Sequence, residues 1–267
     1  MRSAERPLRL RHALVLGLAQ GPAELMPISS SAHTALIASV AGWPYAELDP
    51  GTRKSFEVAL HAGAGLALLG ALGPELRGAA RGLGRSGICA FALAVVPPAL
   101  AGALLRGPVE RRLGGPRSTA AGLLAGSAAM VLADTRRRIR PERTCADARA
   151  HDWLALGVAQ ALALVPGVSR SGATLSAARA RGFGRGPARS LSLAVALPLL
   201  LGAGAAEVGR GRRAGELAAL TGGSAAFAST LLSARVLRGA QRLLPYALYR
   251  AALAVAILVR SRRPAAR

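Results

Sequence analysis

Lysine, acidic residues and aromatic residues are all scarce in this sequence. Lys54 is the only lysine, Asp and Glu total 13 against 35 Lys and Arg, and aromatic residues make up 3% of the 267 positions. Proteins that bind single-stranded nucleic acid stack bases on aromatic rings set among basic residues. Such rings are rare here and the arginines fall in short clusters between apolar segments, so we expect no nucleic-acid partner despite a formal charge of +22.

Cysteine is nearly absent as well. The two cysteines are Cys89, within an apolar run, and Cys145, within a charged segment. Their surroundings differ, and they match no metal-ligand spacing. We therefore expect neither a disulfide nor a structural zinc site.

Charged residues are few for a chain of this length, and apolar residues are many. The charged share is 18%, the hydrophobic share is 52% and the mean hydropathy is +0.35, which is too apolar for an ordinary soluble domain. Six segments approach the roughly 20 residues that a helix needs to cross a bilayer: 56–72, 88–105, 118–133, 191–206, 217–234 and 246–259. The sequence predicts an all-α, polytopic integral membrane protein with about six full spans, forming a single membrane domain over residues 1–267.

Two further apolar regions, 13–40 and 153–178, are each interrupted by proline and a serine cluster. They also resemble each other at an offset of 140 residues: Gly17-Leu18-Ala19-Gln20 matches Gly157-Val158-Ala159-Gln160, and Ser29, Ser31 and Thr34 match Ser169, Ser171 and Thr174. We interpret this as an internal repeat with halves of approximately 1–140 and 141–267, in which each region forms two half-helices meeting at a polar turn. Such interrupted segments mark a site near the bilayer midplane in inverted-repeat membrane folds.

The orientation in the membrane is hard to predict from charge. Arginine clusters lie between many of the apolar segments, so the usual excess of positive charge on cytoplasmic loops is blurred. The densest short cluster, 136–140, is the one that we expect to be cytoplasmic.

The first interrupted region places an acid inside an apolar run. A carboxylate at that depth, here Glu24, is a functional candidate by default. Gln20 lies four residues earlier and therefore on the same helix face. The two side chains suit Mg²⁺, which takes one or two protein carboxylates and completes its shell with substrate phosphates; Ca²⁺ is the alternative metal. The other interpretation is that Glu24 neutralises Arg170.

Ser30 and His33 are three residues apart and share a face of the following helix. This pair suits a nucleophile with a nearby base, or a hydroxyl ligand with a proton donor. Alternatively, Ser30 caps the helix and His33 is a buried structural histidine. Glu57 and His61, four residues apart, either line the same cavity or form a polar pair at the start of a helix.

The second interrupted region has the composition of a phosphate cradle. Residues 166–174 read Pro-Gly-Val-Ser-Arg-Ser-Gly-Ala-Thr. Glycines let backbone amides approach an anion, a helix that begins near Gly172 directs its positive end there, and Arg170 adds a planar fork of donors. The predicted substrate-binding residues are Ser29, Ser169, Arg170, Ser171 and Thr174. The alternative is that the hydroxyls cap broken helices and Arg170 pairs with Glu24.

These stretches resemble the two signatures of the undecaprenyl-diphosphate phosphatase family, also called bacitracin-resistance proteins. The first signature is Gln20-x-x-x-Glu24 with Pro-Ile-Ser-Ser-Ser-Ala-His at 27–33, the second is 166–174, and the start Phe56-Glu57-Val58 is similar too. The resemblance implies an active site that contains Gln20, Glu24, Ser30, His33 and Arg170. It departs from the usual family pattern at Ala32, where Gly is usual, and at Leu191-Ser192-Leu193, where Phe-Ser-Phe is usual.

The resemblance also implies a fold and an activity. The fold is an inverted-topology repeat with two re-entrant helix pairs, and the site depends on a divalent metal and opens toward the outer face of the plasma (inner) membrane. The activity is hydrolysis of undecaprenyl diphosphate to undecaprenyl phosphate and inorganic phosphate, which recycles the carrier lipid for cell-wall synthesis and confers bacitracin resistance. The expected partners are this polyprenyl lipid and membrane lipid, with the oligomeric state open between a monomer and a homodimer.

Two other functions compete with this interpretation. A transporter or flippase explains interrupted repeats, but not the hydroxyl and arginine cluster. The type 2 phosphatidic acid phosphatase family has a Ser-Arg motif like Ser169-Arg170, but it needs a histidine where only Ala, Thr, Leu and Ser follow here.

Overall fold

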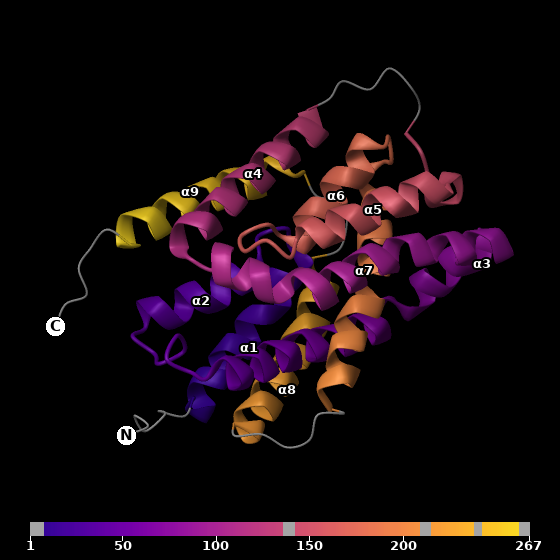
Figure 1. The fold of residues 1–267 in the computed structure, drawn as a ribbon. Coiled ribbons are helices and arrows are strands. Elements are labelled where there is room, and N and C mark those ends of the chain that lie inside the picture. Colours follow the sequence, from indigo (N-terminus) through magenta and orange to yellow (C-terminus); the bar gives the residue numbers. More distant parts are fainter. Residues whose placement is uncertain (1–7, 136–141, 209–214, 238–241, 262–267) are drawn as a thin grey trace. The chain divides into compact units, whose positions relative to one another are not determined.

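The regular structure of this chain is helical (Figure 1). The computed structural model describes residues 8–135, 142–208, 215–237 and 242–261. The helices are α1 (Leu10–Leu25), α2 (Ser30–Val40), α3 (Pro50–Leu113), α4 (Pro116–Thr135), the 3-10 helix η1 (Cys145–Asp147), α5 (Ala150–Leu162), α6 (Arg170–Ala180), α7 (Arg185–Val208), α8 (Glu216–Val236) and α9 (Leu244–Ser261). Within these described ranges the only β-type pairing is an isolated bridge between Arg143 and Phe183. The all-α prediction is confirmed.

The predicted spans coincide with helices. Segments 118–133, 191–206, 217–234 and 246–259 lie in α4, α7, α8 and α9, while 56–72 and 88–105 both lie in α3. We expected two separate helices over the α3 region, but α3 continues for 64 residues. The predicted cytoplasmic cluster at 136–140 lies outside the described residues.

Beside a buried apolar core, many large apolar side chains are exposed and several polar side chains are buried, which is unusual for a soluble protein. Leu104 is 70% exposed and Leu132 is 65% exposed, whereas Gln20 is 2% exposed and Arg250 is fully buried. Among the described residues, three helical segments are long and apolar enough to cross a membrane: Cys89–Leu113 of α3, α8 and α9. Both features identify a membrane protein. Cys89 and Cys145 are free thiols.

The chain divides into two compact units. The first comprises residues 1–25, 30–73 and 196–238, and the second comprises 26–29, 74–195 and 239–267. Each unit takes segments from both halves of the sequence, so this division differs from the predicted repeat halves, which stay a prediction.

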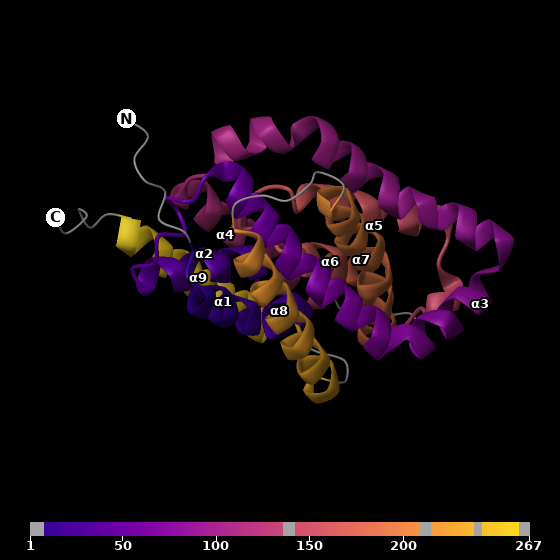
Figure 2. The ribbon, with the colours of Figure 1, turned by 90° about the horizontal axis from the view of Figure 1, so that it is seen from below.

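The first unit is held together by close contact between helix backbones. α1 packs along α8 (Figure 2), and a Cβ added at Gly17 of α1 would overlap the carbonyl oxygen of Gly222 in α8. A Cβ at Gly63 of α3 would overlap the carbonyl oxygen of Gly223 in the same way. Small residues at such contacts are typical of helix pairs in membranes, where packing and not the hydrophobic effect drives association. The Ser229 hydroxyl accepts the Gly21 N–H at 3.2 Å, which links α8 to α1.

In the second unit α4 packs against α6 and α9, and α5 packs against α6 (Figure 1). The loop 163–169 joins α5 to α6 and presses closely on α4. Gly167 has a φ of +89°, and a Cβ there would overlap the carbonyl oxygen of Thr119. A side chain at Gly122 would likewise overlap the carbonyl oxygen of Pro166. Both glycines are therefore required by the close approach of this loop to α4, and the left-handed φ adds a second reason at Gly167.

Candidate active site

A buried carboxylate lies at the end of α1. Glu24 is 4% exposed and Gln20, one turn earlier, is 2% exposed, so the predicted shared face is confirmed and it faces inward. Gln20 Nε2 donates to Glu24 Oε2 at 2.9 Å. Ser30 Oγ, at the start of α2, donates to the same oxygen at 3.1 Å. A loop of four residues, 26–29, joins the two helices and lets them face each other in this way.

His61 of α3 completes this group. Its Nδ1 lies 3.2 Å from Glu24 Oε2 and 3.1 Å from Gln20 Nε2. Of the two interpretations for Glu57 and His61, the structure places His61 against the cluster. Glu57 instead accepts a hydrogen bond from the Tyr45 hydroxyl at 2.8 Å, and burial together with this carboxylate raises the pKa of Tyr45. In the sequence, His61 was marked only by its position four residues after Glu57, at the start of an apolar segment.

The loop before α2 has an unusual backbone. Ser29 has a φ of +73°, and it is the only residue other than glycine with a positive φ among the described residues. This left-handed conformation is unfavourable for a serine and persists only where the surrounding structure holds it. Ser29 is also 4% exposed, so its side chain is buried at the turn.

The serines after this loop lie in different surroundings. Ser30 is half-buried beside Glu24, whereas Ser31 is exposed. His33 is half-buried one turn after Ser30 on α2. Thr34 donates to the Ser30 carbonyl oxygen at 3.1 Å, which fixes the first turn of the helix. Ser30 is therefore the serine of this run that the structure places against the buried acid.

The second predicted group forms the start of α6. Ser169 is the N-cap residue, and its Oγ accepts the Gly172 N–H at 3.2 Å and lies 3.1 Å from Ser171 Oγ. Thr174 Oγ1 donates to the Arg170 carbonyl oxygen at 3.0 Å and lies 2.6 Å from Ser192 Oγ. Ser169 thus caps the helix, whereas Thr174 bonds the carbonyl one turn before it. The N-terminus of α6 is the end of the helix at which an anion is favoured. Arg170 is half-buried in the first turn.

The two predicted groups fall in different compact units. Gln20, Glu24, Ser30 and His33 belong to the first unit, and Ser29, Ser169, Arg170, Ser171 and Thr174 belong to the second. Within the first unit the structure brings Gln20, Glu24 and Ser30 together, and within the second it brings Ser169 and Ser171 together. The proposed pairing of Arg170 with Glu24 stays a prediction.

The group around Glu24 offers oxygen ligands of the kind that hard cations take. No cluster of three His, Cys, Asp or Glu side chains suited to a metal occurs in the described ranges. Mg²⁺ does not need one, because it is commonly bound by one or two carboxylates with water and substrate phosphates filling the other positions. A buried carboxylate that lies within hydrogen-bond distance of both an amide and a hydroxyl fits this requirement.

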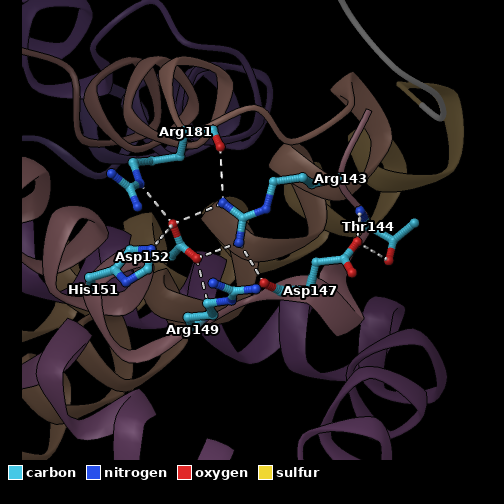
Figure 3. A network of polar contacts seen from close by, with 7 residues as sticks. All are labelled: Arg143, Thr144, Asp147, Arg149, His151, Asp152 and Arg181. Carbon is cyan, nitrogen blue, oxygen red and sulfur yellow. Dashed lines mark hydrogen bonds and ion pairs between the residues drawn. The ribbon is translucent and has the colours of Figure 1, made fainter. Parts of the chain in front are cut away.

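A network of arginines ties together the ends of α5 and α6 that lie opposite the loop 163–169 (Figure 3). Asp152 is 1% exposed and accepts hydrogen bonds from Arg143 Nη2 at 2.6 Å, from Arg181 Nε at 2.7 Å and from the Arg149 N–H at 2.9 Å. Burial alone would raise the pKa of the Asp152 carboxyl, but these donors outweigh it and lower the pKa to about 2. No sequence motif marks this network, because Arg181 lies 29 positions from Asp152 and the nearby arginines resemble the many others of the chain.

Undecaprenyl-diphosphatases are among the known proteins that this chain resembles. The chain is 39% identical over 183 residues to an undecaprenyl-diphosphatase of Geobacter sulfurreducens, which covers 63% of this chain and 64% of the relative. It is 33% identical over 171 residues to undecaprenyl-diphosphatase 1 of Chromobacterium violaceum, covering 62% of each chain. An undecaprenyl-diphosphatase of Parvibaculum lavamentivorans is 37% identical over 170 residues, or 61% of each chain. The matched stretch therefore spans slightly less than two thirds of these curated relatives.

A family model matches much more of the chain. It is described as bacitracin resistance protein BacA, and it matches residues 13–256. This range begins in α1 and ends in α9, and it includes both interrupted regions and every predicted site residue. The chain belongs to the bacitracin resistance protein BacA family.

Proposed function

We propose that this protein is a membrane phosphatase that hydrolyses undecaprenyl diphosphate to undecaprenyl phosphate and inorganic phosphate. Relatives that share 33–39% of their residues with it are named for this activity. The observation that carries the proposal is the buried carboxylate of Glu24, which accepts the hydroxyl hydrogen of Ser30 at 3.1 Å. A hydroxyl held against a carboxylate is an arrangement suited to attack on phosphorus. A lipid substrate also accounts for a site built on membrane helices. The product is the carrier lipid used in cell-wall synthesis, and its recycling is the basis of bacitracin resistance.

The proposed reaction breaks the bridging P–O bond of the diphosphate and adds the elements of water. If Ser30 attacks the terminal phosphorus, its proton passes to Glu24 Oε2, undecaprenyl phosphate leaves, and water then hydrolyses the phosphoserine to inorganic phosphate. If Ser30 instead orients an attacking water, that water displaces undecaprenyl phosphate directly and its proton passes toward Glu24. His33, one turn along α2, moves the proton that the leaving phosphate needs. Arg170 forms a bidentate clamp on the transferring phosphoryl group, while Ser29, Ser169, Ser171 and Thr174 shape the cradle. In phosphoryl transfer, positioning and electrostatics supply most of the catalysis.

A divalent cation, Mg²⁺ with Ca²⁺ as the alternative, is part of this proposal. Glu24 and Gln20 would hold it through their oxygens, and the structure adds Ser30 as a neighbouring hydroxyl. When bound, the cation would offset negative charge on the substrate phosphates. His61, in contact with both Glu24 and Gln20, is proposed to orient them.

The proposed membrane topology is based on the two interrupted regions. The pairs α1–α2 and α5–α6 are proposed to be re-entrant, since 16 and 11 residues in the first pair and 13 and 11 in the second are too few for full crossings. The helices α3, α4, α7, α8 and α9 then supply about six full spans of an inverted repeat. We propose a plasma-membrane location with the site open to the outer face, in a monomer or a homodimer.

The decisive experiment is phosphate release by the purified protein in detergent. Undecaprenyl diphosphate with Mg²⁺ should yield inorganic phosphate, and chelation of the metal should stop it. A flippase would release none under these conditions, but would move labelled lipid between leaflets of vesicles. Release from phosphatidic acid in preference to the diphosphate lipid would favour the type 2 phosphatidic acid phosphatase alternative. Failure of the pure, folded protein to release phosphate from the diphosphate lipid would refute the proposal.

A further inference from the structure

A fully buried arginine lies in α9, outside every predicted site. Arg250 is 0% exposed and donates three hydrogen bonds, all to backbone carbonyl oxygens. Nη1 donates to Pro27 at 3.3 Å, and Nη2 donates to Gly167 at 3.1 Å and to Leu123 at 3.3 Å. All of these residues belong to the second compact unit. One side chain therefore binds the loop 26–29, the loop 163–169 and α4.

The two loop carbonyls are equivalent positions of the internal repeat. At the offset of 140 residues, Pro27 corresponds to Gly167, just as Ser29 corresponds to Ser169. Each carbonyl lies two residues before the serine that precedes a site helix, α2 in one case and α6 in the other. The guanidinium thus binds the same point of both loops. Ser171 adds a direct link, because its hydroxyl donates to the Met26 carbonyl oxygen at 3.3 Å.

The surroundings of Arg250 leave space for its guanidinium. A Cβ added at Gly172 would lie 2.8 Å from Nη1, and one at Gly126 of α4 would overlap Nη2. Gly172 belongs to the second signature, so a glycine there is explained by the arginine as well as by the helix cap. Two glycines from different helices facing one guanidinium indicate a recess built for this side chain.

Packing alone does not explain an arginine at this position. α9 is one of the helices that are apolar enough to cross a membrane, and an arginine buried in such a helix is costly. No carboxylate in the described ranges pairs with Arg250, and its Nε has no hydrogen-bond partner there. A leucine or methionine would fill the volume without burying a charge. The cost is balanced only by the three carbonyls, two of which belong to the loops that carry site residues.

We propose that Arg250 is a positioning residue that fixes the spacing of the loops 26–29 and 163–169, and with them Ser29, Ser169 and Arg170, through the equivalent carbonyls of Pro27 and Gly167. This inference rests on the proposed phosphatase function only for its kinetic consequence. The planar fork of the guanidinium is what allows two nitrogens to reach three carbonyls at once. A lysine ammonium carries the same charge on one atom and reaches fewer of them.

Arg250→Met and Arg250→Lys test this role. In Arg250→Met the turnover number should fall roughly 100-fold, the scale of a misplacement of about 1 Å in a catalytic site, while KM changes little because Arg250 does not touch the substrate. Arg250→Lys should retain an intermediate turnover number. The matched control is Arg179→Met. Arg179 is also buried in the second unit, but it lies in the last turn of α6 and is paired with Glu142 at 2.9 Å. The Arg179→Met variant should lose thermal stability and keep a turnover number close to that of the wild type.

Hydrogen exchange separates this inference from the proposed function. Peptides that cover 26–29 and 163–169 should both exchange faster in the folded Arg250 variants than in the wild type or in Arg179→Met, whether or not phosphate is released. Unchanged exchange in both loops, or a wild-type turnover number in Arg250→Met, would overturn the positioning role. A wild-type protein without phosphatase activity, but with faster loop exchange in the variants, would overturn the proposed function and leave the positioning of the loops standing.

Discussion

Replacing Glu24 with glutamine tests the centre of the proposed site. The substitution keeps the size of the side chain and removes its charge. Glu24 Oε2 accepts hydrogen bonds from Gln20 and Ser30. A hydrogen bond to a charged group contributes about 1.5–3 kcal/mol and a neutral one about 0.5–1.5 kcal/mol. Two weakened bonds therefore lower the free energy of unfolding by about 2–3 kcal/mol, and relief of the buried charge offsets part of this.

The loss of turnover should be much larger than this loss of stability. A positioned proton acceptor contributes roughly 10²–10⁴-fold to rate, which corresponds to about 3–5 kcal/mol of barrier, and Glu24 is also the proposed metal ligand. Glu24→Gln should thus remain folded and membrane-inserted while phosphate release from undecaprenyl diphosphate falls to a few per cent or less.

The assay is phosphate release at saturating Mg²⁺, with size-exclusion chromatography and thermal unfolding as measures of folding. Glu57→Gln is the matched control, because Glu57 is a half-buried carboxylate of the same unit that is bound to Tyr45 and not to the cluster. Its turnover should stay near that of the wild type. If Glu24→Gln keeps more than a few per cent of the wild-type turnover at saturating metal, Glu24 is neither the proton acceptor nor an essential ligand.

Three further predictions concern the rest of the site and its support. Arg170→Lys should lose roughly 10²-fold or more in turnover, since an ammonium cannot form the bidentate clamp; near wild-type turnover, with Arg170→Ala as the floor, would make Arg170 a simple counter-ion. Among alanine substitutions at Ser29, Ser30 and Ser31, that at Ser30 should be the most damaging to phosphate release, and equal losses would make the run a structural turn. Because the pKa of Asp152 is lowered from 3.8 to about 2, its unfolded form binds the proton first as pH falls. Thermal stability in detergent should be level above about pH 4 and decline toward pH 2, a decline that Asp152→Asn should reduce.

The helical architecture was predictable from the sequence because its signals are local. The lengths of the apolar segments predicted the helices, and the prolines with their serine clusters predicted the breaks at 26–29 and 163–169. The shared face of Gln20 and Glu24 followed from their spacing alone. The contact between Ser30 and Glu24 could be anticipated only in part, since it depends on how sharply the chain turns between α1 and α2.

Contacts between distant segments were not predictable. Arg250 binds carbonyls 223 and 83 residues away, and backbone acceptors carry no sequence signature. The Asp152 network joins residues up to 38 positions apart, and its arginines resemble the many other arginines of the chain. His61 was an undecided candidate for the same reason, because its partners Gln20 and Glu24 lie in a different helix.

The close packing of α1 against α8 limits which substitutions this chain can accept. Gly17 and Gly21 meet the backbone and Ser229 of α8 so closely that even one methyl group overlaps its neighbour. Glycine and alanine codons differ by a single nucleotide, so the commonest conservative change available to these positions is also one that they cannot accept. Such a change would move α1 sideways, and Glu24 is carried on the same helix. Substitutions should therefore be tolerated at Leu14 and Leu18, on the exposed side of α1, and selected against at Gly17 and Gly21.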